Sequence, residues 1–310
     1  MTGHWCTACS FILILVVAIN LFPADCRADG FQLASFSFER VPSAEIDLTG
    51  VEEEELETAA STTTTKLAVP IPLAGRETVL LNFITLRVLH QSYGNIEAAD
   101  VAFLPSNLYT IKYGLVFHQT LSDQWSLNVL VQPSLLTDFV DVDSDHLILR
   151  GGFVFERKVS DKLKYALGGG YSDDYGDEKI LPVAWLKWKP CPNWHVNFDI
   201  PQKIEVLRRV SERVQLGLVG KATGAHFRIG QDTPFRNGSD HRVGRVKYSI
   251  VNIGPALDWR IYNGVCLTLN GGTSVYRRYE VFDTDGDKLA ATDFESSIFL
   301  KATVQYSIGD

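Results

Sequence analysis

His90 and Ser92, within the run His90-Gln91-Ser92-Tyr93-Gly94, are the residues of this chain best suited to chemistry. Two residues apart on a β-strand, they project from the same face, so the imidazole could act as base for the hydroxyl. Asn107, at the head of the next expected strand, falls on the corresponding face and could orient the imidazole. A His and a Ser at a strand end are common, however, and an ordinary strand-to-loop transition is the favoured interpretation. We therefore expect no enzyme and keep His90, Ser92 and Asn107 as an alternative catalytic set.

Two acidic loops are the second candidate for chemistry. The runs 141–145 (DVDSD) and 283–287 (DTDGD) each bring several carboxylates close together, as in a Ca²⁺ site, because this hard cation binds several oxygen ligands. Neither run carries the glycine and glutamate that a helix-loop-helix calcium site requires, and solvated loops are favoured. No phosphate-binding glycine loop, zinc motif or dinucleotide fingerprint occurs, so we expect neither a metal nor a cofactor.

The N-terminal apolar run, residues 11–22, is the longest in the chain. It is shorter than the roughly 20 residues that a membrane-spanning helix needs, but it suits the core of a signal peptide. Cleavage after Ala28 is predicted, which makes residues 1–28 the leader. With no second run of spanning length, the mature chain is either soluble or a membrane barrel. The net charge of -8 argues against a nucleic acid partner.

Residues 29–76 differ in composition from the rest of the chain. An acidic run at 51–57 is followed by Ser61 and the threonines 62–65. This composition predicts an acidic, partly disordered segment, because it offers little apolar surface to bury. Short strands over 31–38 and 67–73 are the most order expected within it.

The two cysteines beyond the leader, Cys191 and Cys266, are both predicted to be free. On the expected strand order they lie four to five strands apart, or about 20 Å at roughly 4.8 Å per strand. A disulfide requires Cα atoms within about 7 Å.

From residue 77 onward the pattern predicts an all-β, antiparallel, up-and-down transmembrane β-barrel over 77–310. Short turns recur, each followed at once by an alternating run. These turns are Ser122-Asp123, Ser160-Asp161, Pro192-Asn193, Ser211-Glu212 and Asn263-Gly264. The expected strands are 78–90, 107–119, 124–136, 145–158, 162–172, 179–189, 194–200, 204–210, 213–229, 244–261, 265–280 and 293–308. They number about twelve, an even number that places the first and the last residue of the barrel at the same rim, the one with the short turns.

The loops on the other side are longer and acidic, at 138–145, 173–178 and 283–287. Short turns at one end and long polar loops at the other are typical of bacterial outer-membrane barrels. Aromatic residues gather beside the short turns, as a girdle at a membrane interface would require. They are Trp125, Trp188, Trp194, Trp259 and Tyr262.

Alternation is clearest in the last strand, where Ile298, Leu300 and Val304 share one face and Lys301 and Thr303 the other. A lipid-facing wall around a wet lumen explains this pattern, and so does a soluble β-sandwich with an apolar core. Strand length favours the barrel, because most of the strands reach the roughly nine to eleven residues that cross a bilayer. Candidate lumen-facing residues, of mixed sign, are Lys112, Asn128, Gln132, Asn197, Asp199, Gln215, Lys301, Thr303 and Gln305. Their mixed sign predicts little charge selectivity.

Strand 244–261 breaks the alternation. The apolar residues Val246, Tyr248 and Ile250 lie on one face of the strand, whereas the apolar residues Val251 and Ile253 lie on the other, and Pro255 follows two residues later. A β-bulge near Ile250 would absorb this change of phase.

The run Tyr165–Tyr171 (YALGGGY) and a set of prolines and tryptophans after it resemble a family of outer-membrane β-barrels classified as a domain of unknown function. The later residues of this resemblance are Leu181-Pro182-Val183, Trp185, Trp188, Pro190, Trp194 and Pro201. The resemblance covers most of 77–308 and implies an outer-membrane barrel with no assigned substrate or catalytic residue. The usual aromatic last residue is replaced by Ser307-Ile308-Gly309-Asp310, although Tyr306 lies close by.

The arrangement of His90 and Ser92 also resembles that of outer-membrane acyl hydrolases, whose His-x-Ser-Asn-Gly motif deacylates lipids from the membrane side. Tyr93 stands at the Asn position of that motif.

The favoured hypothesis is a monomeric barrel in the bacterial outer membrane, acting as a narrow passive pore or a structural surface protein. Its expected partners are outer-membrane lipid and, during assembly, the barrel-insertion machinery. The alternatives are a lipid acyl hydrolase using His90 and Ser92, and a soluble secreted β-sandwich that binds a partner.

Overall fold

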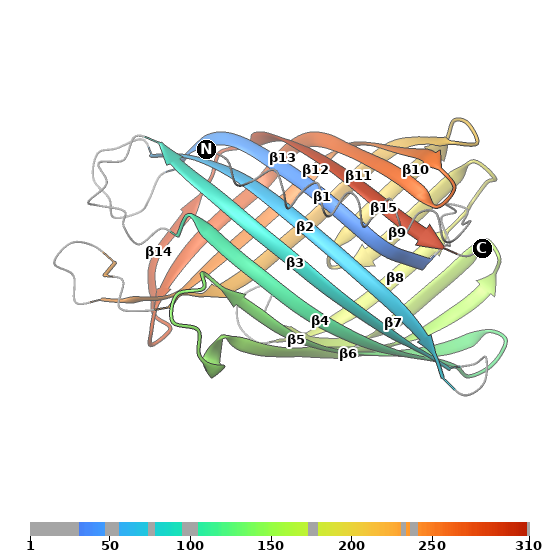
Figure 1. The fold of residues 1–310 in the computed structure, drawn as a ribbon. Coiled ribbons are helices and arrows are strands. Elements are labelled where there is room, and N and C mark those ends of the chain that lie inside the picture. The colour runs from blue at the N-terminus through green and yellow to red at the C-terminus, as the bar shows by residue number, and fades with distance from the viewer. Residues whose placement is uncertain are drawn as a thin grey trace, which may run out of the picture.

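The computed structural model describes residues 31–46, 56–73, 78–94, 105–172, 179–230, 234–235 and 241–308. It forms a closed antiparallel barrel of 14 strands, with one further strand outside the ring (Figure 1). The strands are β1 (Phe31–Ile46), β2 (Leu56–Pro72), β3 (Thr78–Gly94), β4 (Asn107–Thr120), β5 (Trp125–Thr137), β6 (Leu147–Ser160), β7 (Leu163–Ser172), β8 (Lys179–Trp188), β9 (Trp194–Ile200), β10 (Lys203–Arg209), β11 (Val214–Arg228), β12 (Val243–Tyr262), β13 (Val265–Asp283), β14 (Lys288–Asp293) and β15 (Ser297–Ile308). A short 3-10 helix, η1 (Ser144–His146), precedes β6. No helix in these described ranges is long and apolar enough to cross a membrane.

The ring is up-and-down, because neighbours in sequence are neighbours in the sheet from β1 to β13. It closes where β15 pairs with both β13 and β1, with Phe31 opposite Ile308. β14 comes just before β15 in the sequence and, like β15, pairs with β13. Among the described residues, β14 pairs only with the part of β13 nearest the long-loop end of the barrel. A single closed sheet contradicts the β-sandwich, which needs two sheets packed face to face.

The expected count of about twelve strands is wrong, because residues 29–76 supply two more. β1 and β2 pair with each other along their length, and β2 pairs with β3 from Glu57 to Pro72. The threonines 62–65 lie in the middle of β2. Their polarity suggested a solvated tether, but threonine is β-branched and favours strands once a neighbour provides a ladder. The leader, 1–28, lies outside the described residues, as does most of the acidic run 51–57.

Every predicted short turn lies at one end of the barrel, where β1 begins and β15 ends. The aromatic residues expected there are exposed on the outer face: Trp125, Trp188, Trp194, Trp259 and Tyr262. Arginines accompany two of them, since the guanidinium carbons of Arg157 and Arg208 lie 5.3 Å and 6.0 Å from the rings of Trp125 and Trp194. Such a ring of amphipathic side chains is typical of a membrane-water boundary.

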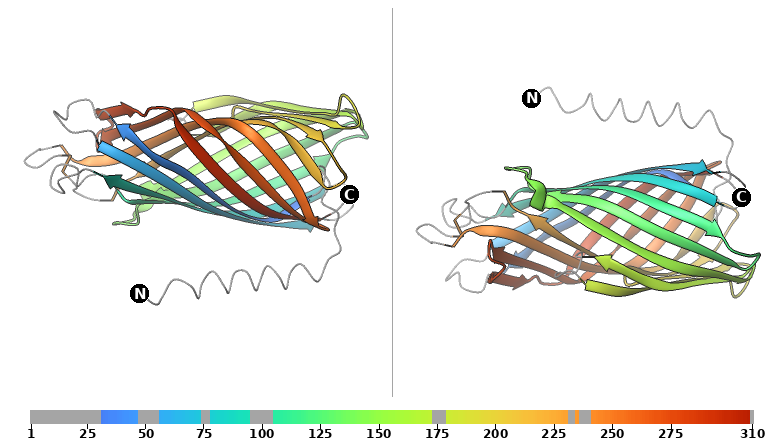
Figure 2. Two further views of the ribbon diagram at one scale, coloured as in Figure 1. Left: turned by 90° about the horizontal axis from the view of Figure 1, so that it is seen from above. Right: turned by 90° about the horizontal axis from the view of Figure 1, so that it is seen from below.

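Figure 2 shows the closed wall of the barrel from two further sides. Large apolar side chains are exposed on strands all around this wall. Leu218 on β11 is 63% exposed and Leu300 on β15 is 66% exposed. Others are Phe36, Val69, Leu86, Phe117, Phe153, Leu167, Ile204 and Ile253. Exposed apolar surface of this extent is unstable in water and marks a surface that another apolar phase covers.

The prediction that both later cysteines are free is wrong for one of them. Cys191 is free and exposed, but Cys266 is disulfide-bonded. The distance argument considered only a bridge between these two residues, and the partner of Cys266 lies outside the described residues.

Candidate functional site: the barrel interior and an opening in its wall

The upper interior, at the long-loop end, is filled by a buried apolar cluster. Phe227, Leu89 and Val246 in it are completely buried. The cluster gathers side chains from the strands β1 to β5 and β11 to β15, namely Val41, Ala60, Leu89, Leu108, Leu136, Ala225, Phe227, Ile229, Val243, Val246, Tyr248, Ile250, Tyr279, Val281, Ala290, Phe294 and Phe299. Within the described residues, this half of the barrel is therefore a packed core and not a water-filled tube.

Arg277 carries a positive charge into this apolar cluster. It is 1% exposed, and its guanidinium carbon lies 4.0 Å from the centre of the Phe294 ring and 5.8 Å from that of Tyr248. Nη1 donates to the carbonyl oxygen of Thr58 at 3.4 Å. Stacking on aromatic faces compensates part of the cost of burying the charge.

Below the apolar cluster, the interior becomes polar. Lys301 donates to Glu39 at 2.8 Å, Asn252 donates to the other oxygen of Glu39 at 2.9 Å, and Ser274 donates to Asn252 at 2.7 Å. These residues belong to β15, β1, β12 and β13, so the bonds run across the inner surface of the wall. Lys221 on β11 is close enough to interact electrostatically with Glu39, Lys301 and with Arg87 on β3. Because β3 and β11 are far apart around the ring, these side chains must converge within the lumen.

The predicted lumen-facing residues lie in this polar half. Oδ1 of Asn128 accepts a hydrogen bond from Nδ1 of His118 at 2.8 Å, while Asn197 donates to Glu205 at 2.9 Å and Gln32 donates to Gln305 at 3.3 Å. The others face inward by alternation with exposed apolar neighbours: Lys112, Gln132, Asp199, Gln215 and Thr303. Inward-facing cations outnumber inward-facing carboxylates here. The cations include Lys66, Arg87, Lys112, Arg150, Lys187, Lys203, Lys221 and Lys301, and the carboxylates include Glu39, Glu156, Asp199, Glu205 and Asp258.

Among the described residues, the strand pairings leave an opening in the wall, which we call the side opening. β6 pairs with β7 only from Gly151 onward, so residues 147–150 have no described partner on that side. β10 pairs with β11 only up to Lys221, and residues 223–227 of β11 likewise have no described ladder partner on that side. The side opening thus lies between β6 and β11, above the ends of β7 to β10.

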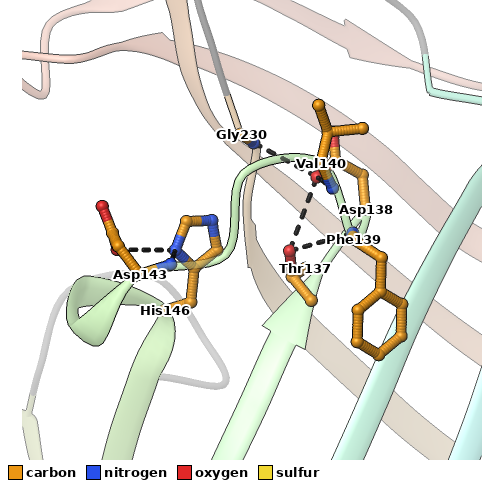
Figure 3. A network of polar contacts seen from close by, with 7 residues as sticks. All are labelled: Thr137, Asp138, Phe139, Val140, Asp143, His146 and Gly230. Carbon is orange, nitrogen blue, oxygen red and sulfur yellow. Dashed lines mark hydrogen bonds and ion pairs between the residues drawn. The ribbon is translucent and has the colours of Figure 1, made fainter.

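A junction between β5 and β11 bounds the side opening at the long-loop end (Figure 3). Arg228 pairs with Thr137 in parallel, and the Asp138 carboxylate accepts bonds from the backbone N–H groups of Gly230 at 3.1 Å and Val140 at 3.0 Å. The backbones of residues 230 and 140 approach so closely that position 230 requires glycine, since a Cβ there would lie 1.4 Å from the carbonyl oxygen of Val140. The left-handed backbone of Phe139, with φ of 66°, is held by a bond from its N–H to the Thr137 hydroxyl at 3.1 Å.

This junction also shows what part of the acidic loop 138–145 does. Asp138 joins backbone groups of two strands, and Asp143 bonds to His146 at 2.8 Å, so both carboxylates serve the local fold. Among the described residues, no group of three or more acidic, histidine or cysteine side chains is arranged to hold a metal ion. Whether the loops are simply solvated remains a prediction.

Two cavities meet at the side opening. The inner one has a volume of about 310 Å³ and lies against the lumen side of β4 to β8. Its lining includes Val116, Leu130, Val154, Val183 and Trp185, with the carboxamides of Asn128 and Gln132. The outer one, of about 540 Å³, includes Val131, Leu147 and Leu149, whose side chains are exposed on the outer face, together with Arg228. Arg150, Gly151 and Tyr171 line both cavities, so the inner and outer cavities adjoin in the wall.

His90, Ser92 and Asn107 lie together on the outer face. His90 is opposite Asn107 in the ladder, and Nδ1 of His90 lies 2.9 Å from Oδ1 of Asn107 in a hydrogen bond. His90 and Ser92 are both exposed, and no hydrogen bond joins them in the described structure. Tyr93 points to the opposite face, where its hydroxyl donates to Gln91 at 2.9 Å. The spatial relation expected from sequence is therefore present, while no result tests whether these residues catalyse anything.

Fourteen strands closed into one antiparallel ring, with a covered polar interior and an apolar exterior, define the protein as a β-barrel of the kind found in membranes. The chain belongs to the family described as a domain of unknown function (DUF6268), which matches residues 28–309. The resemblance drawn from the sequence is thereby confirmed.

Several solved structures similar to this chain are channels. They include a mutant of the monoaromatic hydrocarbon channel TodX (11% identity, 94% of each chain covered, TM-score 0.48). The COG4313 outer membrane channel from Pseudomonas putida F1 has 9% identity, with 91% of this chain and 98% of that chain covered and a TM-score of 0.41. A Pseudomonas aeruginosa FadL homologue has 10% identity, 91% of each chain covered and a TM-score of 0.40. A comparison with curated proteins finds no match.

Proposed function

We propose that this protein is an outer-membrane barrel that lets small, largely apolar molecules pass passively between its lumen and the surrounding lipid through the side opening. The observation that carries the proposal is the gap between β6 and β11, where an inner and an outer cavity share Arg150, Gly151 and Tyr171. A solute in the inner cavity is one wall thickness from the outer face.

Placement in a membrane is supported by the outer surface. Exposed apolar side chains encircle the barrel, and exposed tryptophans and Tyr262 cluster at the short-turn end. Lipid satisfies such a surface, and a closed sheet satisfies its own backbone hydrogen bonds in lipid. Two experiments test the placement: cell fractionation, and gel mobility of boiled and unboiled samples. We expect the protein in the outer-membrane fraction, with a different mobility when unboiled.

A sideways route is favoured over a straight one because the apolar cluster occupies the long-loop end of the lumen. A polar solute would have to pass through fully buried side chains such as Leu89 and Phe227. An apolar solute that enters or leaves through the wall avoids this cluster altogether.

Uptake of a hydrophobic fluorescent probe by intact cells tests this route. N-phenylnaphthylamine is excluded by an intact outer membrane and fluoresces on reaching lipid, so expression of a channel should raise its uptake rate several-fold. Gln132→Trp should fill the inner cavity and return uptake towards the vector level, because Gln132 lines that cavity. Leu216→Trp, on the exposed outer face of β11, is the matched control and should leave uptake unchanged. Equal uptake by the wild type and Gln132→Trp at equal barrel levels would refute the route.

A second candidate function, lipid deacylation, is favoured by one observation, the 2.9 Å bond from His90 to Asn107. A carboxamide oxygen that accepts from Nδ1 leaves Nε2 free to take a proton from a hydroxyl. The detergent-solubilised protein should then release fatty acid from lipid, and Ser92→Ala should abolish the release. Absence of release by folded wild-type protein would exclude the hydrolase.

A further inference from the structure

We infer that the inner cavity binds small amphipathic anions, molecules with an apolar body and one negatively charged group. This inference rests on the proposed function, because it names the class of solute that uses the side opening.

The shape and lining of the cavity suit the apolar body. Its volume of about 310 Å³ lies at the lower end of the range for small-molecule sites. One wall is formed by Val116, Leu130, Val154, Val183 and Trp185, all contributed by neighbouring strands of β4 to β8. Such a wall offers dispersion contacts and excludes water from an aliphatic chain or an aromatic ring.

The charged residues that line the two cavities are both arginines. Arg150 is 3% exposed and lines both cavities, and Arg228 lines the outer one. No carboxylate lines either cavity within the described part of the chain. A guanidinium in a site shielded from water interacts strongly with a carboxylate and offers it two parallel N–H donors. A buried cation of the protein also repels a cationic solute.

The lumen beyond the cavity continues this bias. Lys187 lies with Nζ 5.6 Å from the centre of the Trp185 ring, so a positive charge stands at the cavity's edge. Two carboxylates deeper in the lumen are engaged by protein donors: Glu39 by Lys301 and Asn252, and Glu205 by Lys203 and Asn197. Asp199 also faces the lumen, opposite Trp185 in the β8–β9 ladder. Inward-facing cations nevertheless outnumber the carboxylates, so an anion that leaves the cavity meets a net positive surface. The expectation of weak charge selectivity, drawn from residues of mixed sign, is the opposite prediction, and the same experiment tests both.

Three probes with the same phenylbutyl skeleton and different charge test the inference: 4-phenylbutyrate, 4-phenylbutan-1-ol and 4-phenylbutylamine. Their binding to the full barrel, held in a non-ionic amphipathic polymer, is measured by titration calorimetry at neutral pH. We expect the carboxylate to bind at least tenfold more tightly than the amine, with the alcohol in between. This comparison within the wild type needs no variant and does not depend on any substitution folding.

Arg150→Gln then assigns the preference to one side chain. It should weaken binding of the carboxylate about tenfold and leave binding of the alcohol within twofold of the wild type. Arg150→Lys should keep the order of the three probes, because the charge remains. Arg157→Gln is the matched control, since Arg157 lies on the same strand but stacks over Trp125 on the outer face. It should change none of the affinities.

The outcomes separate this inference from the proposed function. Equal affinity for the three probes, or an unchanged preference in a folded Arg150→Gln barrel, would overturn the anion site while leaving uptake through the side opening intact. Failure of wild-type cells to take up N-phenylnaphthylamine, with the carboxylate still bound in preference, would overturn the route and leave the anion site standing. Absence of binding of all three probes would overturn the site.

Discussion

The upper and lower halves of β12 face opposite environments within one uninterrupted strand. From Val246 to Ile250 the inward side chains are apolar and buried, while Lys247 on the outer face pairs with Glu280 at 3.0 Å. From Val251 to Trp259 the relation is reversed, with Ile253 exposed outside and Asn252 hydrogen-bonded inside. The upper half is organised like a water-soluble protein and the lower half like a barrel in lipid. The reversal near Ile250 therefore indicates where the outer face of β12 leaves the membrane. Thr223 of β11 is opposite Ile250 and forms the lower edge of the side opening, whose β6 side still presents the exposed side chains of Leu147 and Leu149.

Strand length supports this interpretation. β12 and β13 have 20 and 19 residues, whereas about nine to eleven suffice to cross a bilayer. The surplus forms the upper half, which carries the apolar cluster inside and ion pairs outside. Lys288 and Lys247 both bond to Glu280 on the outer side of β13, where Glu280 is buried beneath them and Lys288 is exposed. Such a group of charges is costly away from water.

The largest effect is expected from truncating the apolar cluster. Phe227→Ala removes a completely buried ring from the upper half and should lower the free energy of unfolding by about 3–5 kcal/mol. Thr303→Ala, at an inward position of the lower half, should cost less than about 0.5 kcal/mol. Urea titration of the barrel in lipid vesicles, followed by tryptophan fluorescence, measures both. Equal losses for the two variants would mean that the interiors of the two halves do not differ.

An arginine on the outer face tests the boundary between the halves. Leu218→Arg, on the lower half of β11, should cost about 2–4 kcal/mol, because a charge near the bilayer midplane loses its hydration. Ser249→Arg, on the outer face of the upper half of β12, should cost no more than about 0.5 kcal/mol. Urea titration of both variants in lipid vesicles measures these two losses of stability. A large cost at Ser249 would move the membrane boundary upward and contradict the assignment of the upper half to water.

The polar network of the lower half should matter less to stability. Asn252→Ala removes the bonds to Glu39 and Ser274 and should cost about 1 kcal/mol, because water can replace them in a hydrated lumen. A double-mutant cycle with Ser274→Ala should give a coupling energy below about 0.5 kcal/mol. A loss above 3 kcal/mol would show that this part of the lumen is as dry as the apolar cluster.

Most of the barrel could be predicted because alternation is a local property of the chain. The strand Trp194–Ile200 was predicted with the bounds that it has, and the short turns all lie at one end. The predicted strand count was too low because the polar composition of residues 61–65 was taken to indicate a disordered segment. The threonines 62–65 in fact lie within β2. Glu39, which anchors the polar network of the lumen, was missed for the same reason, because it lies in a segment expected to be partly disordered.

The phase change in strand 244–261 was noticed but explained wrongly. β12 pairs with β11 without a shift in register, and the one irregularity near this point adds Val275 to the partner strand β13. Val246, Tyr248 and Ile250 are apolar because the lumen there is packed, not because the strand turns over. The signal of the apolar cluster was thus present in the sequence.

The sequence by itself determined the all-β class, the end of the barrel at which the short turns lie, the outward face of most of the predicted strands, and the common face of His90, Ser92 and Asn107. These follow from the two-residue period and from turn chemistry, which act between near neighbours. Only the tertiary structure decided that the upper lumen is packed, that β5 meets β11, and that Arg150 lies in a cavity at a gap in the wall. These features depend on contacts across the barrel between strands remote in sequence, and they arise only when the ring closes.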